Sequence, residues 1–164
     1  MQIPPEEERF VKNVQIMAEA IYAGVDKLYK QGHKIIDPSL VLFAAEMIKT
    51  YDPHETIQNF IKHSHVECWD KIKARDETFF INNIAIIFQK LPMDTVALFK
   101  SLFLTVDENG KSVISEGLKT NIWELFDAMV KISIKYVYKH RLADEQFFKD
   151  VDVERHIKVW EVKI

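Results

Sequence analysis

Glycine and proline are scarce in this chain, with four and five copies among 164 residues. An all-β domain needs many tight turns, and tight turns depend heavily on these two residues. Their scarcity argues against an all-β fold and favours long helices joined by short connections. A single cysteine, Cys68, excludes an internal disulfide framework and favours a reducing compartment.

The chain also lacks an excess of charge of one sign. Its 22 Lys and Arg and 25 Asp and Glu give a net charge of −3, so no global positive field attracts nucleic acid. Residues 1–9 lack the basic and then apolar pattern of a signal peptide. The most apolar stretch, residues 76–105, is interrupted by too many polar side chains to be a membrane span. We therefore expect a soluble, intracellular protein of the cytoplasm, the nucleus or a virion.

What the sequence does contain is a succession of segments with apolar residues at three- and four-residue steps, the period of an amphipathic helix. Asp37-Pro38 and Asp52-Pro53 each place an N-cap residue before a proline that suits the first helical position. Ser64 and Glu67 fit a capping box. The helices expected from these signals cover 5–30, 37–50, 53–63, 64–74, 77–91, 95–104 and 115–141, with one or two turns in 143–150.

The buried faces of these helices follow from the same spacing. In the segment 37–50 we predict that the apolar residues at helical steps face the core. These residues are Leu40, Phe43, Ala44, Met47 and Ile48, followed by Tyr51. Residues 76–105 are apolar around most of their circumference, with Pro92 as a hinge between two helices, and such segments are normally buried. The prediction is an all-α, single-domain bundle over residues 1–152, packed around this buried central helical hairpin.

Residues 153–164 differ from the rest of the chain. From His156 to Ile164 apolar and polar residues alternate, and β-branched residues and Trp160 are typical of a strand. A lone strand leaves its backbone groups unpaired and needs a partner, within the chain or from another molecule. We interpret this tail either as a strand that pairs with another molecule or as a helix.

Four side chains that can bind metal occur within one short segment. They are His54, His63, His65 and Cys68. On a continuous helix His63 and His65 point to different faces, although a break at Ser64 could bring them together. Gln58 occupies the position where a zincin helix needs its second histidine. These four residues are kept as candidate metal ligands beside a simpler interpretation, surface histidines at a helix junction, and no cofactor is predicted.

Complete catalytic motifs are missing from the sequence. No serine, threonine or cysteine has the context of a nucleophile, and no glycine-rich loop precedes a helix in a βαβ setting. Residues 105–112 end in the Gly-Lys-Ser of a phosphate-binding loop, but Asp107 and Glu108 would repel a phosphate. We interpret this segment as a polar turn and predict no catalytic residue.

A row of positive charges lies on the helix expected over 115–141. Its members are Lys131, Lys135, Lys139, His140 and Arg141. The lysines recur every four residues and share one helix face, and tyrosines between them could stack on bases or contact a partner. The alternative is a solvated face whose positive end complements the helix dipole. Together with Trp160, these residues are the candidate contacts with a protein partner or with nucleic acid.

Two resemblances bear on the fold. The order Trp69, Asp76-Glu77-Thr78-Phe79-Phe80 and Asn83, followed by Ile132-Ser133-Ile134-Lys135-Tyr136, resembles small helical proteins of large DNA viruses, which implies a viral origin and no particular activity. An apolar helical hairpin wrapped by amphipathic helices is similar to the layout of Bcl-2-like apoptosis regulators. Their Asn-Trp-Gly-Arg signature is matched only in part by Asn121-Ile122-Trp123-Glu124, so binding of a partner helix in a groove is not carried over.

These observations predict a non-enzymatic interaction or scaffold protein that binds a protein partner or itself. Two other classes stay open. One is a nucleic-acid-binding module that uses the basic face of the long helix. The other is a metal-binding protein or enzyme that uses the segment from His54 to Cys68.

Overall fold

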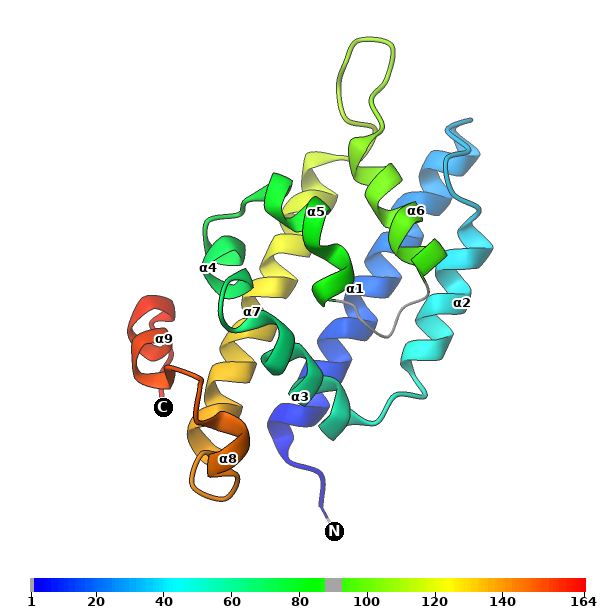
Figure 1. The fold of residues 1–164 in the computed structure, drawn as a ribbon. Coiled ribbons are helices and arrows are strands. Elements are labelled where there is room, and N and C mark those ends of the chain that lie inside the picture. The colour runs from blue at the N-terminus through cyan, green and yellow to red at the C-terminus, as the bar shows by residue number, and fades with distance from the viewer. Residues whose placement is uncertain (1, 88–92) are drawn as a thin grey trace.

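A computed structural model describes residues 2–87 and 93–164, leaving aside the side chains of 85–87, 94, 95 and 98. This part of the chain forms nine helices and no sheet, which confirms the all-α prediction (Figure 1). The helices are α1 (Pro5–Lys30), α2 (Pro38–Ile48), α3 (Pro53–Ser64), α4 (Cys68–Lys73), α5 (Glu77–Ile87), α6 (Met93–Leu104), α7 (Glu116–His140), α8 (Glu145–Phe148) and α9 (Val153–Trp160). Within the described ranges, none of these helices has both the length and the apolarity needed to cross a membrane.

Local signals explain where several helices begin. The Asp37 side chain accepts a hydrogen bond of 3.0 Å from the Ser39 N–H, and the Asp52 side chain accepts one of 3.0 Å from the Glu55 N–H. Both caps are followed by a proline at the first helical position. The capping box at Ser64 is wrong, because Ser64 is the last residue of α3 and its hydroxyl donates to the Phe60 carbonyl.

The two longest helices, α1 and α7, run side by side and antiparallel through the molecule (Figure 1). An added Cβ at Gly24 of α1 would lie only 2.5 Å from Leu118 Cδ2 of α7. Glycine at this position therefore allows the two helices to approach closely. At the opposite end of the pair, Lys139 of α7 donates to Glu6 of α1.

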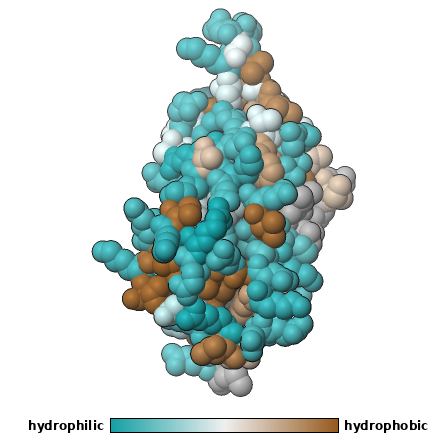
Figure 2. Space-filling view, turned by 60° about the vertical axis from the view of Figure 1, so that its left-hand side comes forward, coloured by the Kyte–Doolittle hydropathy of each residue, from teal (hydrophilic) through white to brown (hydrophobic). Residues whose placement is uncertain are grey.

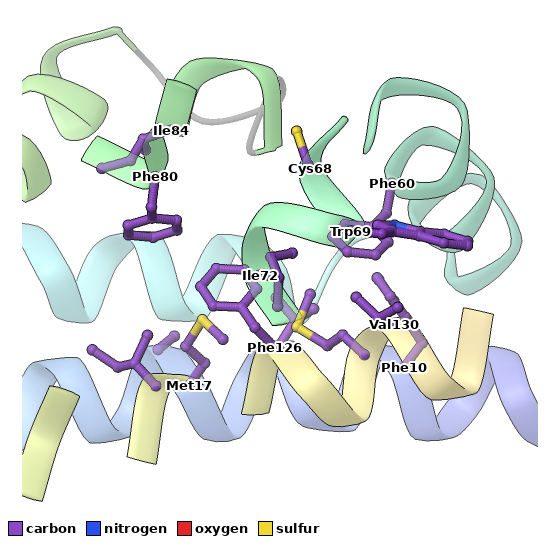
Figure 3. Close-up of a cluster of buried hydrophobic side chains, with 14 of the residues drawn as sticks. Phe10, Met17, Phe60, Cys68, Trp69, Ile72, Phe80, Ile84, Phe126 and Val130 are labelled. Atoms are coloured by element: carbon purple, nitrogen blue, oxygen red, sulfur yellow. The ribbon is translucent and has the colours of Figure 1, made fainter. Parts of the chain in front are cut away.

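Aromatic side chains connect α1 and α7 to the shorter helices (Figure 3). The rings of Phe10 and Phe60 have centroids 5.1 Å apart, and those of Phe80 and Phe126 lie 5.0 Å apart. Trp69 and Phe126 are completely buried. Interlocked rings of this size contribute much of the apolar area that stabilises such a core.

Helices α5 and α6 are neighbours, as expected for the segment 76–105, and contribute Phe80, Ile84 and Leu102 to the core. The centre of the bundle, however, is the α1–α7 pair, and α5 and α6 lie beside it (Figure 1). Leu104 is 57% exposed, so the hairpin covers the core on one side instead of being surrounded by it. The hinge predicted at Pro92 lies outside the described residues.

Of the two interpretations of the C-terminal tail, the strand is wrong and the helix is confirmed. Residues 153–160 form α9, whose first turn is capped by the Asp152 side chain. Val153, His156 and Trp160 follow one another at helical steps and are buried together. Over so few residues the apolar positions fit both periods, and contact with Trp69 of α4 and with α7 favours the helix. No free strand is therefore available at this end for pairing with another molecule.

The side of the molecule that carries α4, α8 and α9 is turned forward in Figure 2. Hydrophilic residues cover most of this face, and hydrophobic residues form separate patches on it. Ion pairs lie along the margins of α9, where Arg155 contacts Asp70 at 2.9 Å and Glu154 contacts Arg141 at 2.7 Å. Together these contacts hold α9 against the body of the fold.

Candidate interaction surface

Helix α2 is apolar on more than the face that it buries. The core side consists of Val41, Ala44, Ala45 and Ile48. Leu40, Leu42 and Phe43 are 49%, 44% and 65% exposed, so the prediction that Leu40 and Phe43 face the core is wrong. Isolated exposed apolar residues are common in monomers, whereas three on one short helix are unusual and suggest a contact site. We call these three residues the α2 surface.

Opposite charges flank the α2 surface. Asp37 precedes the helix, and hydrogen bonds from the backbone and hydroxyl of Ser39 hold the pKa of its carboxyl below the usual value. Lys49 follows the helix and pairs with Glu46 at 2.9 Å, which raises the pKa of the lysine. Both groups are exposed and charged at neutral pH. The start of the helix therefore carries the negative charge of Asp37, and its end carries the ion pair of Lys49 with Glu46.

A cavity of about 100 Å³ lies beside α2, among α1, α2, α3, α5, α6 and α7. Its lining is almost entirely apolar, and Phe10, Met17, Phe60, Phe80 and Ile84 of this lining are visible in Figure 3. Helix α2 contributes Val41, Ala44 and Ile48 to the wall. The polar part of the lining consists of Tyr51, between α2 and α3, and of Thr56, Asn59 and His63 of α3. An engineered apolar cavity of about 150 Å³ in another protein binds benzene, so this cavity suits a single apolar side chain or smaller group.

A separate polar cluster joins α1, α3 and α7. The Tyr136 hydroxyl donates to Glu7 Oε2 at 3.4 Å and lies 3.2 Å from His54 Nδ1, which is also 3.4 Å from the Glu7 carboxylate. Burial, followed by the negative charge of Glu7, raises the pKa of Tyr136 to about 12. The contacts of this cluster fasten the three helices together.

The structure places the candidate metal ligands in different surroundings. His54 belongs to the polar cluster, His63 lines the cavity, and the ring of His65 contacts that of Trp69 with centroids 6.4 Å apart. Cys68 is buried, and burial raises the pKa of its thiol. Nowhere in the ranges 2–87 and 93–164 do three or more His, Cys, Asp or Glu side chains come together as they would around a metal ion.

Part of the predicted basic row is engaged within the chain. Lys139 pairs with the buried Glu6, and Arg141 pairs with Glu154 and packs over the Tyr138 ring at 4.3 Å. The His140 ring lies 4.5 Å from the Tyr136 ring. Lys131 is exposed, and Lys135 is half-buried. Trp160 is only 3% exposed, so a partner could reach its ring only if α9 moved.

Sequence reasoning missed the buried roles of Glu6 and Glu7 at the start of α1. No local signal identifies them, because Lys139 and Tyr136 lie far away along the chain. It also missed that Leu40 and Phe43 are exposed. No family model, no curated protein and no solved structure matches this chain.

Proposed function

We propose that this chain is a non-enzymatic interaction protein that binds another protein molecule through the α2 surface. The observation that carries the proposal is Phe43, a large apolar side chain that is 65% exposed and has Leu40 and Leu42 beside it on the same helix. Aromatic residues are among those that most often anchor protein interfaces.

Burial of the α2 surface supplies enough free energy to matter in a complex. Complete burial of one large apolar side chain contributes about 1.5–3 kcal/mol. Three such residues, already partly buried, would offset a share of the cost of association, which is several kcal/mol.

The other two classes have less support. Nucleic-acid binding would use the basic row, but Lys139 and Arg141 of that row already form ion pairs with Glu6 and Glu154. Metal chemistry would need His54, His63, His65 and Cys68 to come together, and they lie in different surroundings. The α2 surface instead offers three exposed apolar side chains for contact with a partner.

A photo-crosslinking amino acid at position 43, introduced in the native cell, tests the proposal. We expect a discrete crosslinked protein from this position and none from position 12, where the exposed Lys12 lies on α1. Leu40→Ser should reduce the crosslink, because Leu40 and Phe43 share one helix face. Equal labelling from positions 43 and 12 would show that the α2 surface is not a specific binding site.

A further inference from the structure

We propose that the cavity beside α2 is a binding site for a small, neutral aromatic molecule that carries one hydroxyl or carbonyl group. The cavity has a volume of about 100 Å³ and is lined by residues of α1, α2, α3, α5, α6 and α7. Helix α2 reaches it with Val41, Ala44 and Ile48, which are buried, whereas the residues of the α2 surface are exposed. Binding in this cavity therefore does not depend on the proposed function.

Phenylalanine rings make up much of the apolar lining. They are Phe10, Phe60, Phe80, Phe99 and Phe103, and the first three are drawn in Figure 3. Phe80 and Phe103 meet edge to face with ring centroids 5.7 Å apart, and the tilted rings of Phe10 and Phe60 lie 5.1 Å apart. An aromatic ring that enters the cavity can make further contacts of this kind. The lining therefore favours an aromatic ligand over an aliphatic one of the same size.

The volume of the cavity limits the ligand to one ring. An engineered apolar cavity of about 150 Å³ in another protein binds benzene. The present cavity is smaller, at about 100 Å³, so it has no room for two fused rings. A polar substituent on a single ring must therefore lie at the edge of the cavity instead of deep inside it.

Polar side chains form one such edge. Thr56, Asn59 and His63 recur at steps of three and four residues, so they share one face of α3. All three are partly exposed, which places this edge next to solvent. The Thr56 hydroxyl donates to the Asp52 carbonyl and keeps its own acceptor sites. Within the described ranges, the side chains of Asn59 and His63 have no hydrogen-bond partner, so both are available to a ligand.

The charge of the lining selects for neutral ligands. Among the described residues, no lysine, arginine, aspartate or glutamate lines the cavity. A charged ligand would therefore lose its hydration without gaining a strong ion pair. A neutral hydroxyl or carbonyl needs only one or two hydrogen bonds, and the amide of Asn59 supplies both a donor and an acceptor. Benzyl alcohol fits these requirements, whereas benzoate has a similar size but a negative charge.

Methionine methyl groups can report this binding in the unmodified full chain. Met17 and Met129 line the cavity, and Met47 and Met93 do not. At about pH 8, where histidine side chains are mostly neutral, benzyl alcohol should shift the NMR signals of Met17 and Met129 and leave those of Met47 and Met93 unchanged. The shifts should saturate in the millimolar range or below, as for a ligand of few atoms. Benzoate should bind at least about tenfold more weakly, and naphthylmethanol should cause no shift.

Two pairs of variants test the two parts of the site. Ala44→Leu fills the cavity and should weaken benzyl alcohol binding by about tenfold or more, whereas Ala23→Leu adds the same atoms on the exposed side of α1 and should not. Asn59→Leu should weaken benzyl alcohol binding by about three- to tenfold without weakening that of toluene, which has no hydroxyl. Asn121→Leu, at an exposed position of α7, should change neither. Circular dichroism checks that every variant is folded.

Several results would overturn the proposal. They are the absence of saturable shifts at Met17 and Met129, equal shifts at all four methionines, and binding of benzoate as tight as that of benzyl alcohol. Undiminished binding by folded Ala44→Leu would do the same, and if this variant does not fold, the methionine signals of the unmodified protein decide. An equal loss of toluene and benzyl alcohol binding in Asn59→Leu would overturn the role of the polar edge. Crosslinking from position 43 tests the α2 surface separately.

Discussion

Lys139 Nζ, in the last turn of α7, lies 2.5 Å from Glu6 Oε1 in the first turn of α1, 133 positions earlier in the chain. Glu6 is only 1% exposed, whereas more than half of the Lys139 side chain is exposed. Burial raises the pKa of Glu6, but the hydrogen bond from Lys139, a backbone hydrogen bond and nearby positive charges outweigh it. The net effect is a pKa below the usual value.

Lys139→Met should destabilise the fold by about 1–3 kcal/mol at neutral pH, because it leaves a buried carboxylate without its partner. The loss should shrink as the pH falls through the lowered pKa of Glu6, where the carboxyl takes up a proton in both proteins. Urea unfolding of the variant and the parent protein at several pH values measures both effects. Lys131→Met, at an exposed position of the same helix, should change stability by less than about 0.5 kcal/mol.

The burial of His156 in α9 makes the stability of the protein depend on pH in acid. Its ring is 3% exposed and packs against Trp69, with centroids 4.8 Å apart. Burial lowers the pKa of His156 below 6.5, and Arg155 lowers it further, while Asp70 and Asp152 act in the opposite direction. Burial also lowers the pKa of the neighbouring His65. The folded protein therefore favours neutral rings.

The unfolded chain takes up these protons at higher pH than the folded protein does. Stability is therefore complete above pH 6.5 and falls as the pH drops from there toward the lower pKa of the folded state. His156→Phe should flatten this pH dependence, and His33→Gln, at an exposed position, should not. Urea unfolding followed by tryptophan fluorescence measures the slope. A gain in stability on acidification would contradict the prediction.

Two neighbouring alanines in α2 test the cavity. Ala44 and Ala45 are both buried, but only Ala44 is part of the cavity lining. Ala44→Leu should fill the space and stabilise the protein by about 0.5–2 kcal/mol. Ala45→Leu adds the same atoms to a packed core and should cost about 1–3 kcal/mol. Thermal and urea unfolding should give opposite signs, and a loss of stability in both variants would mean that the cavity cannot accept a side chain.

Ser64 holds the indole of Trp69. Its hydroxyl accepts a hydrogen bond of 2.8 Å from Trp69 Nε1, and both residues are almost completely buried. Ser64→Ala leaves this buried donor without an acceptor and should cost about 1–3 kcal/mol. Ser101 also donates to the carbonyl four residues earlier but is exposed, so Ser101→Ala should cost less than about 0.5 kcal/mol. Equal losses in urea unfolding would contradict this account.

Features that depend on a few neighbouring residues were predictable from the sequence. Asp37-Pro38 and Asp52-Pro53 start helices because the cap and the proline act within one turn. The tail was not predictable in the same way, since its apolar residues fit two periods and burial of Trp160 decides between them. The partners of Glu6 and Glu7 depend on contacts between α1 and α7, which no local pattern contains.

The candidate interaction surface was only half predictable. The apolar character of α2 is evident from its sequence, and Leu40 and Phe43 fit a buried stripe as well as Val41 and Ala45 do. A helix that is apolar around most of its circumference does not specify which side faces the core. The neighbouring helices α1 and α6 settle that choice, and they leave Phe43 exposed.

The antiparallel pairing of α1 with α7 has a consequence for how the chain folds during synthesis. Helix α1 leaves the ribosome before the other described helices, but α7, which covers much of its apolar face, follows only after α2 to α6 have been made. Contacts between such distant segments are slow to form, and exposed apolar surface in the interval favours aggregation. The nascent chain should therefore depend on chaperones until residue 140 has emerged.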